Sequence, residues 1–161
     1  IFPEGGSHDQ TKLLPLKVGV CLMALGAMDK YRDSNCQVTL VPVGLNYFSQ
    51  HKFNSRVLVK YGDPIFIKPA LVEQFSTGGS ARKQAVQSLL DVINQALREV
   101  TVQAPDWDTM RTFWALRDLY CPAKRLMNMS MVDKVILSQA FANDYPRVKG
   151  DKGVDELLPK I

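Results

Sequence analysis

One stretch of the chain carries apolar residues at helical spacing, and it constrains the fold more than any other feature. Apolar side chains recur there at intervals of three and four, which predicts an amphipathic helix. They are Val86, Leu89, Leu90, Ile93, Leu97 and Val100. Thr77-Gly78-Gly79-Ser80 interrupts the chain just before this helix, and Ser80 is placed to cap it. Pro105 ends the unit.

Short β-branched segments come before this helix. Residues 38–43 predict a buried strand that Pro42 interrupts near its end. Residues 56–61 alternate in the manner of a second strand, and residues 65–67 form a short third strand after a Gly-Asp-Pro turn. These signals place the chain in the α/β class.

Two segments near the start extend the pattern. Ile1-Phe2 is strand-like and leads directly into a Gly-rich turn. Residues 13–28 are apolar with several small residues, and Pro15 sits where a first helical turn tolerates proline, so a buried helix is predicted. The predicted architecture is a partial mixed sheet with packed helices, followed by a C-terminal helical extension.

Further helices are predicted towards the end of the chain. Asp106 or Asp108 caps one that Pro122 stops, and Ser130 with Asp133 resembles a capping box for a last helix through residue 141. The chain is polar and charged from residue 143 on. We therefore predict an α/β part over residues 1–75, a helical extension over 76–147 and a polar tail or linker over 148–161.

Composition excludes several classes of function. The net charge of +4 suits an anionic metabolite or membrane surface, but the Lys and Arg residues are scattered, so no nucleic-acid partner is expected. The three cysteines show neither CxxC spacing nor a histidine at metal-ligand spacing, so no metal site is expected. The longest apolar stretch, residues 18–28, has about half the length that a bilayer span needs.

Because the chain begins at Ile1 in the middle of a strand-like pattern, we expect it to be a fragment of a longer protein.

The densest polar constellation is Phe2-Pro3-Glu4-Gly5-Gly6-Ser7-His8-Asp9. A strand end followed by two glycines can aim backbone N–H groups at an anion, and Glu4 could accept a hydroxyl or orient its neighbours. The alternative is a plain turn with solvated polar residues. It is not a phosphate-binding P-loop, because GxxxxGK[ST] is absent. Adjacent Ser, His and Asp residues point in different directions, so they do not form a catalytic triad.

Two other features could contribute to a site. Lys17 is a lone cation in an apolar segment, and it either extends to solvent or meets a phosphate at the mouth of the glycine turn. Val41-Pro42-Val43 ends a strand and could line a groove for an acyl chain, or it could be a simple strand exit. His51 lies in a polar loop and is predicted to be a surface histidine.

Taken in order, these motifs resemble the glycerol-phosphate and lysophosphatidate acyltransferase superfamily. That family has four motifs: His-x-x-x-x-Asp, a Gly/Arg-containing motif, F-P-E-G-T-R-S, and V-P-hydrophobic. Residues 1–7 resemble the third and Val41-Pro42-Val43 the fourth. Leu14-Pro15-Leu16-Lys17 and Tyr61-Gly62-Asp63-Pro64-Ile65 are similar to runs that follow them. The residues in and around these motifs are most similar to those of the fungal-type acyltransferases that use glycerol 3-phosphate or dihydroxyacetone phosphate. The resemblance extends to about residue 147.

Two departures from the family pattern matter. The first two motifs are missing, and neither His8 nor His51 has an Asp five residues on, so the general-base histidine is expected upstream of Ile1. Ser7 stands where the third motif has arginine, as in the fungal-type branch. His8, Lys12 and Lys17 remain as substitutes for that arginine.

The resemblance implies acyl transfer from acyl-CoA to the sn-1 hydroxyl of glycerol 3-phosphate or dihydroxyacetone phosphate, in phospholipid and phosphatidic acid synthesis. Substrate-binding residues would be Phe2, Pro3, Glu4, Gly5, Gly6, Ser7, His8, Lys17, Val41, Pro42 and Val43. No catalytic residue, metal or cofactor is expected in this chain, and the segment alone is expected to be inactive. The protein would face the cytosol at the endoplasmic reticulum membrane, anchored by segments outside this chain and in contact with the lipid surface.

Two alternatives stay open. One is an acyltransferase that uses lysophosphatidate, since the discriminating residues belong to the second motif. The other is a non-catalytic lipid- or membrane-binding module that keeps the same fold.

Overall fold

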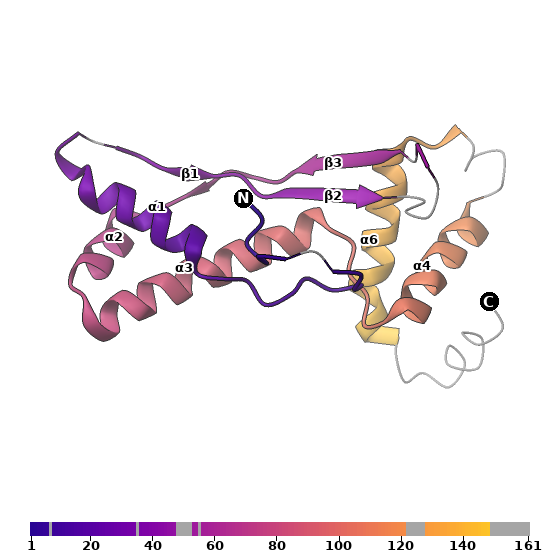
Figure 1. Cartoon of the computed structure of the whole chain (residues 1–161). Helices are drawn as coiled ribbons and strands as arrows, with labels where there is room; N and C mark the ends of the chain where they lie inside the picture. The colour runs from indigo at the N-terminus through magenta and orange to yellow at the C-terminus, as the bar shows by residue number, and fades with distance from the viewer. Residues whose placement is uncertain (7, 35, 48–52, 55, 122–127, 149–161) are drawn as a thin grey trace. The chain divides into compact units, whose positions relative to one another are not determined.

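A computed structural model describes residues 1–6, 8–34, 36–47, 53–54, 56–121 and 128–148 of the chain (Figure 1). The chain divides into two compact units. The first contains residues 1–8, 13–44 and 59–100, and the second contains residues 9–12, 45–58 and 101–161.

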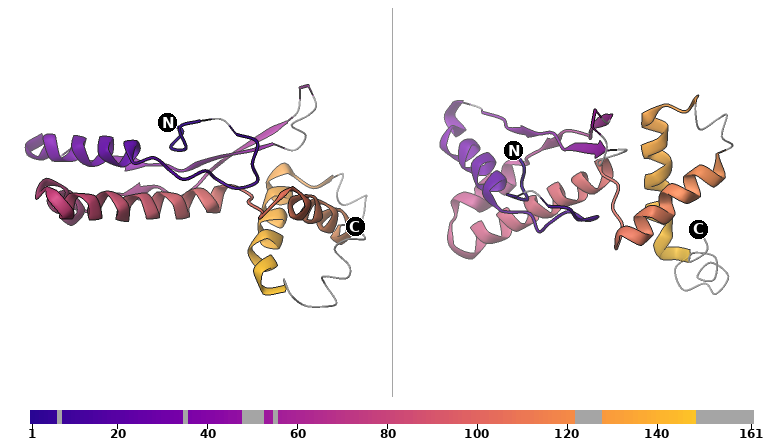
Figure 2. Two further views of the ribbon diagram at one scale, coloured as in Figure 1. Left: turned by 60° about the horizontal axis from the view of Figure 1, so that its bottom comes forward. Right: turned by 45° about the vertical axis from the view of Figure 1, so that its right-hand side comes forward.

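Three helices form the core of the first unit. They are α1 (Gly19–Lys30), α2 (Pro69–Ser76) and α3 (Gly79–Val100), and each contacts the other two (Figure 2). The predicted stripe of α3 is confirmed, since Val86, Leu89, Leu90, Ile93 and Val100 are all buried. Burial of each such side chain contributes about 1.5–3 kcal/mol to the stability of the unit.

The strands form two antiparallel pairs. β1 (Thr39–Leu40) pairs with β4 (Ile65–Phe66), with Thr39 opposite Phe66 and Leu40 opposite Ile65. β2 (Val43–Tyr47) pairs with β3 (Val57–Tyr61), and their arrows run in opposite directions in Figure 1. The α/β class is therefore confirmed. Within the described ranges, antiparallel pairs stand where a partial mixed sheet was predicted.

The strand at residues 38–43 was predicted as one element and is divided in the structure. β1 ends at Leu40 and β2 begins at Val43, with Pro42 between them. Proline has no N–H to donate to a ladder, which accounts for the break. β2 continues to Tyr47, beyond the end of the predicted strand at residue 43.

The start of α1 was also predicted wrongly. The helix begins at Gly19 rather than near residue 13, and Ile1-Phe2 lies outside any strand. The N–H of Leu14 donates to the Glu4 carboxylate and that of Lys17 to the Pro3 carbonyl. These long-range bonds hold residues 14–17 in an extended loop.

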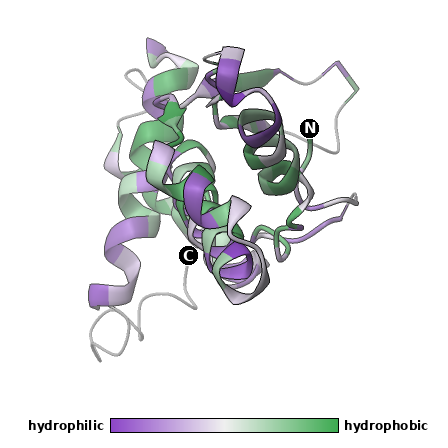
Figure 3. Ribbon diagram, turned by 90° about the vertical axis from the view of Figure 1, so that its left-hand side faces the viewer, coloured by the Kyte–Doolittle hydropathy of each residue, from purple (hydrophilic) through white to green (hydrophobic). Residues whose placement is uncertain are grey.

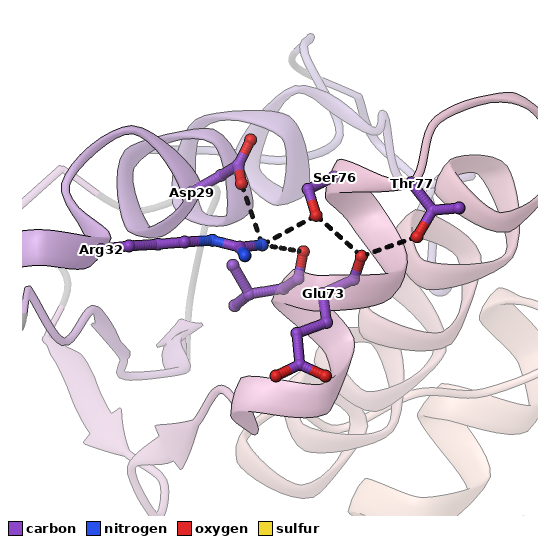
Figure 4. A network of polar contacts seen from close by, with 6 residues as sticks. Asp29, Arg32, Glu73, Ser76 and Thr77 are labelled. Carbon is purple, nitrogen blue, oxygen red and sulfur yellow. Dashed lines mark hydrogen bonds and ion pairs between the residues drawn. The ribbon is translucent and has the colours of Figure 1, made fainter.

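One polar cluster fastens α1 to α2 (Figure 4). The Arg32 guanidinium, just after α1, pairs with Asp29 at 3.0 Å and donates to the Val72 carbonyl at 3.0 Å and to Ser76 Oγ at 2.8 Å. Ser76 in turn donates to the carbonyl of Glu73. Arg32 thereby satisfies a carbonyl of α2, a helix that was not predicted and that begins with Pro69 in its first turn.

The second unit is built on α4 (Trp107–Tyr120) and α6 (Met131–Val148), which contact each other. Asp106 caps α4 as predicted, accepting the Thr109 N–H at 2.8 Å. The capping box of α6 is confirmed by bonds between Ser130 and Asp133 at 2.7 and 3.1 Å. The helix runs seven residues beyond its predicted end at residue 141, so residues 143–148 are helical rather than linker.

A small apolar cluster joins these two helices. It contains Ala104, Met110 and Phe113, with Phe113 meeting the ring of Tyr145 edge-on at 5.5 Å. Tyr145 lies beyond the predicted end of α6, and its contact with Phe113 helps to explain why the helix continues. The predicted division at residue 75 stays a prediction, and α3 belongs by its contacts to the first compact unit.

The helices carry both hydrophobic and hydrophilic residues (Figure 3). None of the helices in the described part of the chain has both the length and the apolar character to cross a bilayer.

Candidate functional site

The candidate site is centred on a tight turn at the start of the chain, which we call the Glu4 turn (residues 2–6). The Gly5 N–H donates to the Phe2 carbonyl at 3.1 Å and closes the turn. Gly5 has φ +68°, a left-handed conformation that glycine adopts at little cost. The structure thus requires the first glycine of the Gly-Gly pair, whereas a Cβ on Gly6 would meet open space.

The Glu4 carboxylate makes two contacts through one oxygen. Oε2 accepts the backbone N–H of Leu14 at 2.8 Å and lies 2.6 Å from His8 Nε2. The side chains of Glu4 and His8 are only 17% and 20% exposed, so water screens their ion pair incompletely when His8 is protonated. The Glu4 carboxylate thus contacts both the segment that leads to α1 and the histidine four residues on.

Lys17 lies directly over the turn. Its N–H donates to the Pro3 carbonyl at 2.8 Å, and its side chain reaches back across Gly5. A Cβ placed on Gly5 would lie 2.8 Å from both Cδ and Nζ of Lys17. The residue is exposed, and its ammonium forms no ion pair with any residue that the structure describes.

The other two candidate cations are placed differently. His8 is paired with Glu4, and Ser7 lies outside the described residues. Lys12 belongs to the second unit, where it lies close to Asp106. The N–H of Thr109, more than the charge of Lys12, holds the pKa of Asp106 below its usual value. Of the three substitutes for the missing arginine, Lys17 alone is at the Glu4 turn without an ion-pair partner among the described residues.

The fourth motif forms a second group of residues. Val41 and Val43 are exposed, whereas Pro42 between them is buried. The Pro42 carbonyl accepts the N–H of Gly62 at 2.9 Å. A Cβ on Gly62 would lie 2.8 Å from Pro42 Cγ and 2.9 Å from Val100 Cγ1. Close approach of the two chain segments therefore explains the glycine in the Tyr-Gly-Asp-Pro turn.

The structure places the predicted residues of the third and fourth motifs in two groups. Glu4, Gly5, His8 and Lys17 share one cluster, and Pro42 belongs to the other. Leu14 was not predicted as part of the cluster, because its contribution is a backbone N–H, which sequence does not mark. His51 lies outside the described residues.

Cys21 and the possible metal ligands are the remaining groups that could take part in chemistry. They contain no group of three or more His, Cys, Asp or Glu side chains that could hold a metal ion. Burial raises the pKa of the Cys21 thiol to about 11, so this cysteine stays protonated and is a poor nucleophile.

Comparison with known proteins relates the chain to fungal acyltransferases. It is 52% identical over 120 residues to glycerol-3-phosphate O-acyltransferase 1 of Saccharomyces cerevisiae, which covers 74% of this chain and 15% of that protein. It is 40% identical over 152 residues to glycerol-3-phosphate O-acyltransferase 2 of the same yeast, which covers 92% of the chain and 20% of the relative. An uncharacterised acyltransferase of Schizosaccharomyces pombe is 40% identical over all 161 residues, which make up 23% of its length.

The chain thus spans less than a quarter of the length of these relatives. No protein-family model and no solved structure matches it. The resemblance to fungal-type acyltransferases that the motifs indicated is confirmed by the identities.

Proposed function

Because this chain is homologous to a segment of the fungal glycerol-3-phosphate acyltransferases, we propose that it supplies the acceptor-binding turn of such an enzyme. The whole protein would transfer an acyl group from acyl-CoA to the sn-1 hydroxyl of glycerol 3-phosphate or dihydroxyacetone phosphate. The fold of the complete domain would be the one that the superfamily shares.

The chemistry needs a base, an oriented acceptor and a place for negative charge. The hydroxyl oxygen attacks the thioester carbonyl, its proton passes to a base, and coenzyme A leaves as the thiol. We propose that the base is the histidine of a His-x-x-x-x-Asp motif elsewhere in the polypeptide. This segment would hold the acceptor phosphate so that the hydroxyl faces that base.

The position of Lys17 over Gly5 is the observation that carries the proposal. An ammonium group without an ion-pair partner in the described residues stands above a glycine turn, where a phosphate needs a cation and N–H donors. The third motif offers no arginine for this purpose, since Ser7 occupies its place. Lys17 would neutralise the phosphate above the turn that Phe2, Pro3, Gly5 and Gly6 form.

The acyl donor would lie along the fourth motif. Val41 and Val43 expose apolar side chains on either side of the buried Pro42, as a surface for an acyl chain would. We further propose a cytosol-facing position at the endoplasmic reticulum membrane and a role in phospholipid synthesis. The exposed apolar residues and the net charge of +4 are compatible with an anionic lipid surface.

Acceptor preference tests the proposed activity. The full-length protein that carries this segment should be expressed in membranes and assayed with acyl-CoA and labelled glycerol 3-phosphate, dihydroxyacetone phosphate or lysophosphatidate. Turnover of either of the first two acceptors is expected. Turnover of lysophosphatidate alone would establish the other acyltransferase activity, and turnover of none would favour the non-catalytic lipid-binding module.

Replacing Lys17 tests its role in the same assay. A charge-assisted hydrogen bond contributes about 1.5–3 kcal/mol, so Lys17→Met should raise the KM for glycerol 3-phosphate roughly 10- to 100-fold. The KM for acyl-CoA should change little. Lys12→Met, which alters a cation of the second unit, is the matched control. An unchanged acceptor KM in Lys17→Met would assign Lys17 to simple solvent exposure.

A further inference from the structure

Two hydrogen bonds tie the Glu4 turn to the segment that carries Lys17. The Leu14 N–H reaches Glu4 Oε2 at 2.8 Å, and the Lys17 N–H reaches the Pro3 carbonyl at 2.8 Å. Leu14 and Lys17, whose N–H groups are the donors, are three residues apart, and the acceptors Pro3 and Glu4 are consecutive residues. The turn and the segment are therefore fixed against each other at both ends of residues 14–17.

Local structure does little to hold Lys17 in place. Residues 14–17 belong to neither a helix nor a strand, and α1 begins only at Gly19. Pro15 has no N–H to contribute. The orientation of the Lys17 side chain over Gly5 thus depends on the bonds to Pro3 and Glu4.

The Glu4 carboxylate is poorly suited to bind the phosphate itself. An ionised carboxylate only accepts hydrogen bonds and repels a second anion nearby. Its Oε2 already takes the Leu14 N–H and contacts His8, and the side chain is only 17% exposed.

We infer that Glu4 is a positioning residue that acts through Lys17, and that His8 holds the Glu4 carboxylate in place. The inference rests on the proposed function, since it assigns Lys17 the phosphate of the acceptor. His8 would then serve as the partner of Glu4 and would not take over phosphate binding from the arginine of the third motif.

A double-mutant cycle in the full-length enzyme separates this role from direct contact. Glu4→Ala, Lys17→Met and the double variant are assayed for the KM of glycerol 3-phosphate and of acyl-CoA. Glu4→Ala alone should raise the acceptor KM about 10-fold, the loss of one strong hydrogen bond. When Lys17→Met is already present, Glu4→Ala should raise the acceptor KM by no more than a further factor of about two, because the effects of residues that act as one unit are not additive.

The inference would be overturned if the rise in acceptor KM in the double variant equalled the product of the rises in the two single variants. Glu4 would then contact the acceptor independently of Lys17. An unchanged acceptor KM in Lys17→Met would instead contradict the proposed role of Lys17, so the two failures are distinguishable.

Conservative variants give a second readout, which also applies if Glu4→Ala does not fold. Glu4→Gln keeps an oxygen for the Leu14 N–H and should hold the acceptor KM and kcat within about three-fold of wild type. A large fall in kcat alone would show that the carboxylate charge takes part in the reaction, against a positioning role.

His8 is tested by a pair of substitutions of its own. His8→Gln retains a donor that can reach Glu4, whereas His8→Ala has none. The acceptor KM should rise in the alanine variant and be largely restored by glutamine. Equal effects of the two substitutions would show that His8 does not act by donating to Glu4.

Discussion

Gly5 and Lys17 depend on each other at the scale of single residues. Gly5 takes a left-handed conformation, and the aliphatic stem of Lys17 fills the space where a side chain would be. Gly6 next to it has neither constraint. The two adjacent glycines therefore differ in the structural reason for their presence.

Alanine substitution should expose this difference. Gly5→Ala places an L-residue in the left-handed region, which costs roughly 1–2 kcal/mol, and it also pushes Lys17 away. We expect a lower melting temperature and a higher KM for glycerol 3-phosphate. Gly6→Ala is the matched control for stability and should change the free energy of unfolding by no more than about 0.5 kcal/mol. Equal destabilisation by both substitutions would contradict the observed turn geometry.

Helix caps decide several boundaries at the scale of secondary-structure elements. Asp106 accepts the Thr109 N–H at the start of α4, and that bond holds its pKa below the usual value. A depressed folded-state pKa means that the carboxylate stabilises the helix fully above the unfolded pKa of about 3.9. This stabilisation is lost as the pH falls through the lower, folded-state pKa.

Substitution of Asp106 should follow the same logic. Asp106→Ala should speed amide hydrogen exchange in the first turn of α4 at pH 7, because the Thr109 N–H loses its acceptor. Asp106→Asn keeps an acceptor and should protect these amides at pH 7. Below about pH 4 the advantage of the wild-type aspartate over asparagine should shrink. An advantage that grows on acidification would contradict the assigned sign.

Apolar side chains remain exposed on several elements, which matters at the scale of the whole molecule. β2 exposes Val43, Leu45 and Tyr47, and β3 exposes Val57, Val59 and Tyr61. Ile1 and Phe2 are 85% and 75% exposed. Exposed apolar faces of this kind mark surfaces that other parts of a protein or a partner cover.

The 161-residue segment alone is accordingly predicted to bind a hydrophobic dye or to aggregate. The full-length protein that carries this segment should do neither if the rest of its chain covers these faces. Dye fluorescence and light scattering at matched concentrations make the comparison. A monomeric, dye-negative segment that melts cooperatively would contradict the prediction and favour a self-sufficient, non-catalytic module.

The same segment is predicted to transfer no acyl group by itself. Neither of its two histidines has an aspartate five residues on, so the general base of the proposed mechanism is missing. General acid–base catalysis contributes about 10²–10⁴ in rate, and the orientation of attack would be lost as well. An assay with labelled glycerol 3-phosphate and acyl-CoA measures this. Turnover well above the uncatalysed rate would show that the catalytic residues lie within this chain.

The sequence alone determined those features that depend on neighbouring residues. The apolar stripe of α3, the alternation of β3 and the cap at Ser130 were predicted correctly, and Asp106 was one of the two residues predicted to cap α4. The predicted cap at Ser80 was wrong, because α3 already begins at Gly79. Each correct prediction follows from local chemistry at short spacing, in which periodicity selects the element and a side chain satisfies a nearby N–H. Motif order was equally informative, and the relationship to the fungal acyltransferases is confirmed.

Tertiary structure decided what depends on distant partners. The position of Pro15 is compatible with a helix that begins at residue 13. The backbone N–H groups of Leu14 and Lys17 bond to the Glu4 turn instead, and α1 begins only at Gly19. The same bonds place Lys17 over Gly5, a position that the spacing of the two residues in the sequence does not show. A backbone N–H is identical in nearly every residue, so only the folded chain can show which carboxylate or carbonyl it reaches.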